Sequence, residues 1–442
     1  MPYDKGARLP GESASKLGHL RVIQSPWVQE LISEFEYASA KPVDSSNTLW
    51  TEFDPATSTP LDRIFAVDGS FSTVSSTDYP VKEVSFVKTA LIRVDKSKLD
   101  KIDKDNPHPL LLQDALADSA LYHSTVFPLK NVKSKLGSNY DAVRHIVRDS
   151  MHVDQGGAYY DTLKWLAYRK WTGIQNASPA FDCPHCSVEI SGLPFDTDEE
   201  RCQNCKGVVF LTDMIGFHLD MGEDSAPENV ASAYMLIMET LMLFTAVRYY
   251  WDAADKSLVS DTLFIKDGPL TLRSQYSKLV PSIRSFLEFS KNQKRLVHLI
   301  GQEKSGIFAE HLASIVRFAA PHDRGEQPTY AALSHDYVRR EVYRSPNLLN
   351  PYGMRTNWGE KMYVKLDPGA YVVINVPTGE YDKAPDSPKL GDLIGLNRIS
   401  ATLPNLISHK FEGALFPVEL ANGVASMSSY PSAKVLQLFA GF

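Results

Sequence analysis

The stretch of sequence that decides the fold is Ile64-Phe65-Ala66-Val67-Asp68-Gly69-Ser70, in which four apolar residues run into an acid and a glycine. A short apolar run that ends at a turn former predicts a buried strand, here with Asp68 at its carboxyl end. The same pattern returns at residues 262–268, where Asp267 precedes a glycine. Asp-Gly is also a common turn. In open α/β sheets, however, chemistry gathers at the carboxyl ends of strands, so both acids are candidates for a site.

Strand-like and helix-like segments alternate through most of the chain. Apolar or β-branched runs predict further strands at residues 84–94, 296–300 and 371–376. Apolar residues at helical spacing, or a proline suited to a first turn, predict helices at residues 26–37, 110–122, 159–171 and 281–292. Alternating strands and helices indicate an α/β fold in which helices pack on the sheet.

One predicted helix is unusually apolar. Fourteen of the 18 residues at 230–247 are apolar, and Glu239 sits near the middle. An unpaired carboxylate is costly inside a bilayer, and the amino terminus lacks the apolar segment of a secretory signal. The sequence therefore predicts a soluble, cytoplasmic protein with no membrane partner, in which this helix is buried. A buried carboxylate needs a shifted pKa, a cationic partner or a metal, and Arg248 lies about 13 Å further along the helix.

The four cysteines of the chain form two Cys-x-x-Cys pairs. Cys183 and Cys186 are separated from Cys202 and Cys205 by 15 residues. Two such pairs at this spacing supply four thiolates for a tetrahedral Zn²⁺ ion, and a site closed by four cysteines stabilises structure without catalysing. The alternative is a pair of reduced dithiols that bind no metal. His185, inside the first pair, is predicted to be a surface residue and not a ligand.

The charge balance and the missing motifs exclude several classes of function. The chain has 442 residues, with 46 basic and 53 acidic side chains and a net charge of −7. A protein that coats nucleic acid by global charge is excluded, so any such binding must use a local patch or a partner. The sequence contains neither a P-loop nor the Gly-x-Ser-x-Gly elbow of α/β-hydrolases.

Asp68, Glu239 and Asp267 together suggest a metal site. Two of these acids follow predicted strands, and the third lies on a predicted buried helix. Carboxylate oxygens suit the hard cations Mg²⁺ and Mn²⁺. Ions held in this way activate water and stabilise the leaving oxygen during phosphodiester cleavage.

The order of these motifs resembles that of the NurA nuclease family. The resemblance is carried by residues 66–70, the helix bearing Glu239, Phe264 to Leu270 with Asp267 inside it, and the run from Leu299 to Ser305. Order and approximate spacing agree over residues 60–310, apart from an insertion at about 100–225.

The resemblance implies an RNase H/PIWI-like core, with a mixed sheet flanked by helices. It implies a manganese- or magnesium-dependent DNA nuclease that acts on single strands or duplex ends. The expected assembly is a homodimer docked on a HerA-type hexameric ATPase, in DNA end processing, repair or anti-phage defence. Asp68, Glu239 and Asp267 would be the catalytic metal ligands, and Lys304 would contact DNA phosphate.

The same resemblance divides the chain. Residues 1–60 would be an N-terminal extension, and residues 61–442 a nuclease domain interrupted by a helical insertion at 100–225 that contains a zinc ribbon at 181–210. The family ends in a Tyr-Pro helix with a further His or acid near the metals. The nearest match here is residues 416–424, with Glu419 inside it and His409 upstream.

Two alternatives stay open. The chain is a non-catalytic zinc-ribbon adaptor of a DNA translocase if its acids form only turns and a buried polar network. It is an actin-like or sugar-kinase-like phosphotransferase if the Asp-Gly loops hold phosphate and Mg²⁺. That last reading requires a second glycine-rich loop and an adenosine pocket, and the sequence shows neither.

Overall fold

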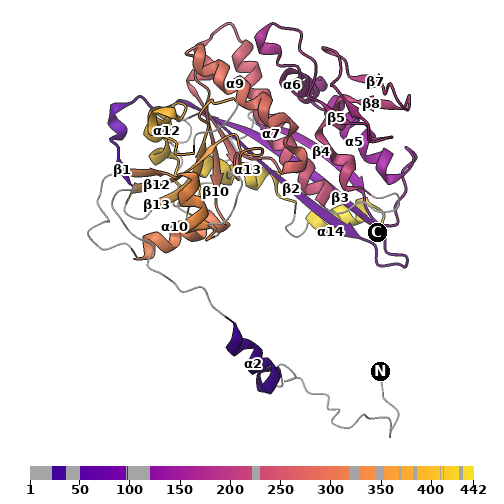
Figure 1. The fold of residues 1–442 in the computed structure, drawn as a ribbon, viewed down its shortest axis with the longest axis horizontal. Coiled ribbons are helices and arrows are strands. Elements are labelled where there is room, and N and C mark those ends of the chain that lie inside the picture. Colours follow the sequence, from indigo (N-terminus) through magenta and orange to yellow (C-terminus); the bar gives the residue numbers. More distant parts are fainter. Residues whose placement is uncertain are drawn as a thin grey trace. The chain divides into compact units, whose positions relative to one another are not determined.

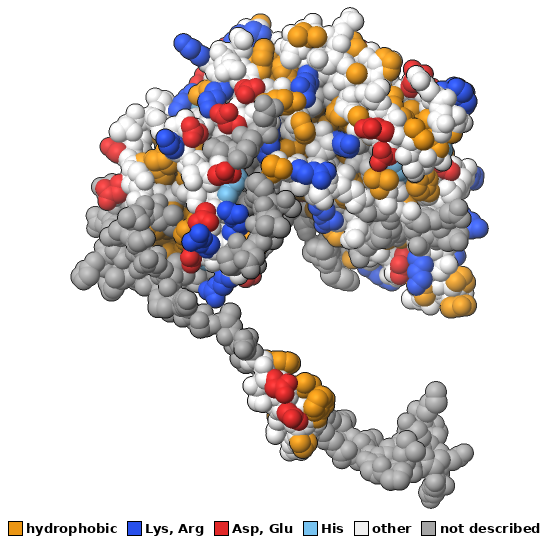
Figure 2. Space-filling model, in the orientation of Figure 1, with side chains coloured by type: hydrophobic (Ala, Val, Ile, Leu, Met, Phe, Trp, Pro, Cys, Tyr) orange, Lys and Arg blue, Asp and Glu red, His pale blue; other side chains and the backbone are white. Residues whose placement is uncertain are grey.

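The computed structural model describes residues 22–35, 50–95, 97, 120–221, 229–318, 328–344, 353–367, 370–381, 386–408, 410–411, 413–427 and 432–442. The chain divides into two units, Met1–Ser45 and Ser46–Phe442. In the first unit the predicted helix is present as α2 (Pro26–Glu34), which begins at a proline and has no buried residue. Figure 2 shows apolar and acidic side chains together on the surface of this helix.

The second unit is built on a mixed sheet, which has nine strands among the described residues (Figure 1). Its order is β1-β11-β12-β13-β10-β9-β2-β3-β4. Only the β2–β9 and β9–β10 pairs are parallel. The bounds are β1 (Thr51–Glu52), β2 (Arg63–Ser75), β3 (Glu83–Asp95), β4 (Ala120–Pro128), β9 (Thr262–Asp267), β10 (His298–Glu303), β11 (Thr329–Ala332), β12 (Glu360–Asp367) and β13 (Ala370–Val376).

Helices cover both faces of this sheet. Successive residues of a strand point to opposite faces, so neighbouring apolar residues pack against different helices. Val67 of β2 belongs to the hydrophobic cluster that α7 dominates, whereas its neighbour Ala66 belongs to a second cluster with α12 and α13. The helices are α5 (Asn139–Val153), α6 (Ala158–Ala167), α7 (Asn229–Asp252), α8 (Ser257–Ser260), α9 (Val280–Asn292), α10 (Ile307–Phe318), α11 (His335–Tyr337), α12 (Leu396–Thr402), α13 (Phe416–Ala425) and α14 (Ser432–Phe439). The predicted α/β fold, a mixed sheet flanked by helices, is therefore confirmed.

The apolar helix α7 lies in the core, as predicted. It is long and apolar enough to cross a membrane, but 83% of its apolar window is buried inside the protein. It packs along β2 and β3, which Figure 1 shows beneath it. This placement brings the middle of α7, with Glu239, onto the strand that carries Asp68.

Two local predictions are wrong. β2 does not end at Asp68 but continues to Ser75, because β3 pairs with it along its whole length. The predicted helix at 110–122 fails over residues 120–122, which begin β4 and pair with β3; residues 110–119 lie outside the described part of the chain. In both cases, pairing with a strand distant in the sequence overrides the local signal.

Candidate metal centres

The two strand acids lie next to each other in the sheet. Val67 and Lys266 are the last partners of the parallel β2–β9 ladder, so Asp68 and Asp267 are the next residues of neighbouring strands. Asp68 is 3% exposed, whereas about a fifth of the Asp267 side chain is open to solvent. The acidic site therefore lies where the pairing between β2 and β9 ends, and not where β2 itself ends.

A glycine lets Glu239 reach this site from the opposite helix layer. A Cβ atom on Gly69 would lie 2.9 Å from Glu239 Oε1 and 2.5 Å from Met235 Cγ, both on α7. Any larger residue would displace the Met235 and Glu239 side chains from their positions against β2. The Asp-Gly pair is thus not a turn here; its glycine allows close packing of a helix on a strand.

The three carboxylates interact electrostatically with one another. Burial, together with the nearby charges of Asp267 and Glu239, raises the pKa of Asp68 to about 8, against the opposing effects of Asn422 and Lys304. Burial also raises the pKa of Glu239, against the opposing effect of Lys266. Asp68 Oδ1 accepts a 2.7 Å hydrogen bond from Gly69 N, but the buried Oδ2 has no partner in hydrogen-bond geometry.

Two lysines engage the other two acids. Lys266 Nζ donates to Glu239 Oε2 at 2.6 Å and to the Asp267 carbonyl oxygen at 2.7 Å, and it is fully buried. Lys304 Nζ lies 3.0 Å from Asp267 Oδ1. The sequence reasoning missed Lys266 and considered only Arg248 as a partner for Glu239. Strand alternation was the available signal, since Phe264 and Lys266 share the face that α7 covers.

Helix α13 contributes an amide and not an acid to this site. Asn422 lowers the pKa of Asp68 through a side-chain hydrogen-bond interaction, although its geometry does not give Oδ2 a full hydrogen bond. Glu419, the acid inside the nearest match to the closing helix of the family, accepts a hydrogen bond of 2.7 Å from Ser408 Oγ. His409 lies outside the described residues. Ser70 Oγ donates to the Ala425 carbonyl at 2.7 Å and so fixes the end of α13 to β2.

One feature of this cluster suits a hard divalent cation, although the three acids do not bring their oxygen atoms together as closely as a metal-ligating group does. Asp68 has a buried oxygen without a partner and a carboxyl whose ionisation the surroundings oppose. A cation bound there would satisfy both, because it supplies a ligand for the oxygen and a counter-charge for the carboxylates. Lys266 and Lys304 compete with it for Glu239 and Asp267.

We expect Asp68→Asn to stabilise the protein at alkaline pH when Mn²⁺ and Mg²⁺ are absent. The folded pKa of about 8 exceeds the ordinary value of 3.8, so the contribution of Asp68 to stability is full below about pH 4 and is lost as the pH rises through about 8. Each unit is worth about 1.4 kcal/mol, which gives several kcal/mol at about pH 9. Thermal unfolding across this pH range measures the effect.

Asp78→Asn, an exposed change in the β2–β3 hairpin, is the matched control and should show no such gain. Added Mn²⁺ should stabilise the wild type more than Asp68→Asn. Parallel stability curves for wild type and variant at every pH would contradict the described environment of Asp68.

The four cysteines form the second candidate centre, on two small hairpins. The first hairpin joins β5 (Phe181–Asp182) to β6 (Glu189–Ile190), and the second joins β7 (Glu199–Arg201) to β8 (Val208–Phe210). The residue after the second cysteine of each pair is left-handed, with φ 56° at Ser187 and 62° at Lys206. The two Cys-x-x-Cys turns, or knuckles, thus have the same backbone conformation.

The sulfur atoms have the spacing that zinc requires. Cys183 Sγ lies 3.8 Å from Cys205 Sγ, and Cys186 Sγ lies 3.8 Å from Cys202 Sγ. A tetrahedron with Zn–S bonds of ~2.3 Å has S···S edges of about 3.8 Å. Within the described ranges, these four are the metal-ligating group whose donor atoms all lie within 4.8 Å of one another; Asp68, Glu239 and Asp267 are not so compact.

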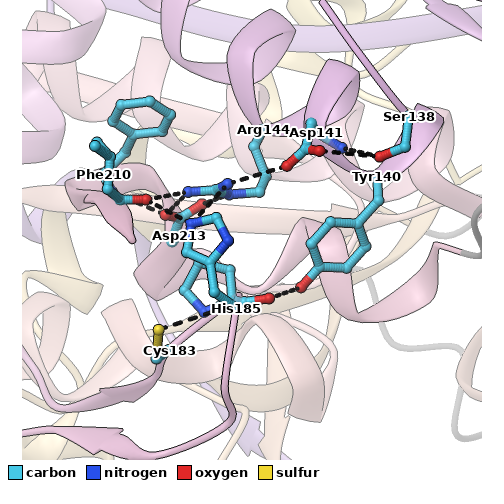
Figure 3. Close-up of polar contacts among 10 residues, drawn as sticks. Ser138, Tyr140, Asp141, Arg144, Cys183, His185, Phe210 and Asp213 are labelled. Carbon is cyan, nitrogen blue, oxygen red and sulfur yellow. Dashed lines mark hydrogen bonds and ion pairs between the residues drawn. The ribbon is translucent and has the colours of Figure 1, made fainter. Parts of the chain in front are cut away.

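A buried ion pair holds the ribbon against α5 (Figure 3). Arg144 donates from Nε and Nη2 to the two carboxylate oxygens of Asp213 at 2.8 and 2.9 Å, and from Nη2 to the Val208 carbonyl at 2.8 Å. Tyr140 OH donates to the Pro184 carbonyl at 2.6 Å. The His185 ring lies against the same Val208 carbonyl and takes no part in the cysteine cluster. This contact therefore joins the first hairpin of the ribbon to the second.

Comparison with known proteins finds no family model and no curated protein that matches this chain.

Proposed function

We propose that this chain is a divalent-metal-dependent DNA nuclease, in which Asp68, Glu239 and Asp267 hold Mn²⁺ or Mg²⁺. The single observation that carries the proposal is the buried Asp68 carboxyl. It lies among the charges of two further acids, its pKa is raised to about 8, and its Oδ2 has no partner. Strongly perturbed carboxyl groups of this kind are candidates for functional sites.

The strand order supports an RNase H-like core. β2, β3 and β4 form an antiparallel succession, after which β9 and β10 add in parallel beside β2, giving the order β4-β3-β2-β9-β10. Asp68 is on β2 and Asp267 ends β9. Glu239 is on α7, which lies between these two strands in the chain. This arrangement agrees with the motif order that the NurA resemblance rests on.

Each acid and Lys304 would have a separate role in cleavage. Bound cations would supply an activated water and charge neutralisation at the scissile phosphate. Asp68 and Asp267 would hold the cations from adjacent strands, and Glu239 would reach them across Gly69. Lys304, whose side chain is 29% exposed, would leave Asp267 and contact a phosphate oxygen.

A partner is part of the proposal because the chain is acidic. A protein with a net charge of −7 binds DNA poorly by itself at physiological salt. We propose that a homodimer works in the cytoplasm with a HerA-type hexameric ATPase that feeds the strand to the site. Its role would be DNA end processing, in repair or in anti-phage defence.

The direct experiment is a cleavage assay on single-stranded DNA and on duplex ends. We expect cleavage with Mn²⁺ or Mg²⁺, none without a divalent cation, and a higher rate when the ATPase and ATP are added. Equal rates with and without the motor would contradict the partner. An absence of cleavage under every condition would contradict the enzyme.

One observation favours a second candidate, the zinc-ribbon adaptor. Glu239 and Asp267 already have lysine partners at 2.6 and 3.0 Å, so a purely structural polar network would account for both acids. Manganese binding distinguishes the two functions. A nuclease binds Mn²⁺ through Asp68, whereas an adaptor binds zinc alone.

A further inference from the structure

A cavity of about 770 Å³ lies between the end of α6 and the first turn of α9. Its described lining includes Arg169, Lys278, Arg284 and Arg355, and none of the described lining residues is Asp or Glu. The whole chain has more acids than bases, 53 against 46. The described wall of the cavity thus reverses the net charge of the protein, and its four cations favour an anionic ligand.

Arg284 is the strongest of these features. It is 6% exposed, and its guanidinium donates to two backbone carbonyls, those of Met354 and Asn357. In the part of the chain that the structure describes, no carboxylate forms an ion pair with it, and Glu360 acts on it only at longer range. A buried charge is costly without a counter-charge, so an anion in the cavity would stabilise it.

The other three cations stand at different points of the wall. Arg169 has a left-handed backbone, with φ 49°, and its guanidinium lies 4.9 Å from the centre of the Tyr381 ring. Its Nη2 also donates to Tyr381 OH at 2.7 Å, which fixes the side chain. Lys278 and Arg355 are exposed, and neither has an ion pair among the described residues. They remain available to a ligand at the mouth.

The side chains of the cavity wall narrow the class of ligand. Tyr381 supplies an aromatic side chain, and arginines recognise phosphate with paired donors. We propose that this cavity binds the phosphoryl groups of a nucleotide, either a free nucleoside triphosphate or a unit of a nucleic-acid strand.

The test uses the full zinc-loaded chain without Mn²⁺, so that it is independent of the proposed nuclease. The probes are inorganic tripolyphosphate and ATP by calorimetry, and a fluorescent oligothymidylate by anisotropy. Lys278→Glu combined with Arg355→Glu removes two exposed cations and should weaken binding at least tenfold. Lys82→Glu, an exposed change in the β2–β3 hairpin, should leave it unchanged. Arg284→Met should also weaken binding, with retained zinc as the check on folding.

The probes separate the two sources of phosphate. ATP binding that the oligonucleotide does not displace identifies a free nucleotide, whereas oligonucleotide binding with the same sensitivity to the double variant identifies a strand. Either result supports the site. Failure of all three probes to bind, or equal weakening by Lys82→Glu and by the double variant, overturns it. Because all three probes are measured without Mn²⁺, a failed nuclease assay does not decide this experiment.

Discussion

Asp68→Asn is expected to lower Mn²⁺-dependent DNA cleavage by about a thousandfold or more. The change keeps the shape of the side chain but removes the carboxylate, whose Oδ2 is free to bind a cation. A metal ion contributes several kcal/mol of charge stabilisation, and each 1.36 kcal/mol is tenfold in rate, so loss of a ligand on this scale gives about three decades. Asp267→Asn should have a comparable effect, since it removes the adjacent ligand.

The control for this experiment is Asp78→Asn, an equal loss of charge on the exposed β2–β3 hairpin. It should cleave at the wild-type rate. Zinc content and thermal unfolding verify that each variant is folded. Wild-type rates for purified, folded Asp68→Asn and Asp267→Asn would remove the acids from the catalytic site.

Cys202→Ser is expected to abolish stoichiometric zinc binding and to destabilise the ribbon. Binding of structural Zn²⁺ is worth about 10–16 kcal/mol in isolated fingers, and this free energy holds the two hairpins together. Cys183 and Cys202 are buried in the same cluster as Leu193, Val209 and Leu211, so the loss extends into the packing against α5. Metal analysis should fall from one zinc per chain to well below one.

His185→Asn is the matched control for the zinc prediction. It lies inside the first knuckle but outside the ligand set, and it should keep one zinc per chain. Its effect should be confined to the contact with Val208. One equivalent of zinc in Cys202→Ser would contradict a four-cysteine site.

The sequence was sufficient where the signal was local. The spacing of the cysteines predicted their cluster, because each knuckle is closed by a few neighbouring residues. The burial of α7 also followed from its composition, since a helix that is apolar nearly all round must be covered. The strand at residues 262–267 needed only its run of apolar residues.

The sequence was insufficient where distant segments meet. Asp68 was predicted at the end of a strand, but antiparallel pairing with β3 carries β2 on to Ser75. Lys266 pairs with Glu239 only because β9 lies beneath α7, and Asn422 approaches Asp68 only because α13 packs on the other face of β2. Only Lys266 leaves a local pattern, the strand alternation that places it on the face covered by α7.

The most direct test of the account is a crystal of the full chain soaked in Mn²⁺, with anomalous scattering measured at the manganese edge. We predict a peak within coordinating distance of Asp68 and Asp267, with Lys304 turned away from Asp267. A map without manganese at this place, in which Lys266 and Lys304 still hold Glu239 and Asp267, would contradict a shared metal site.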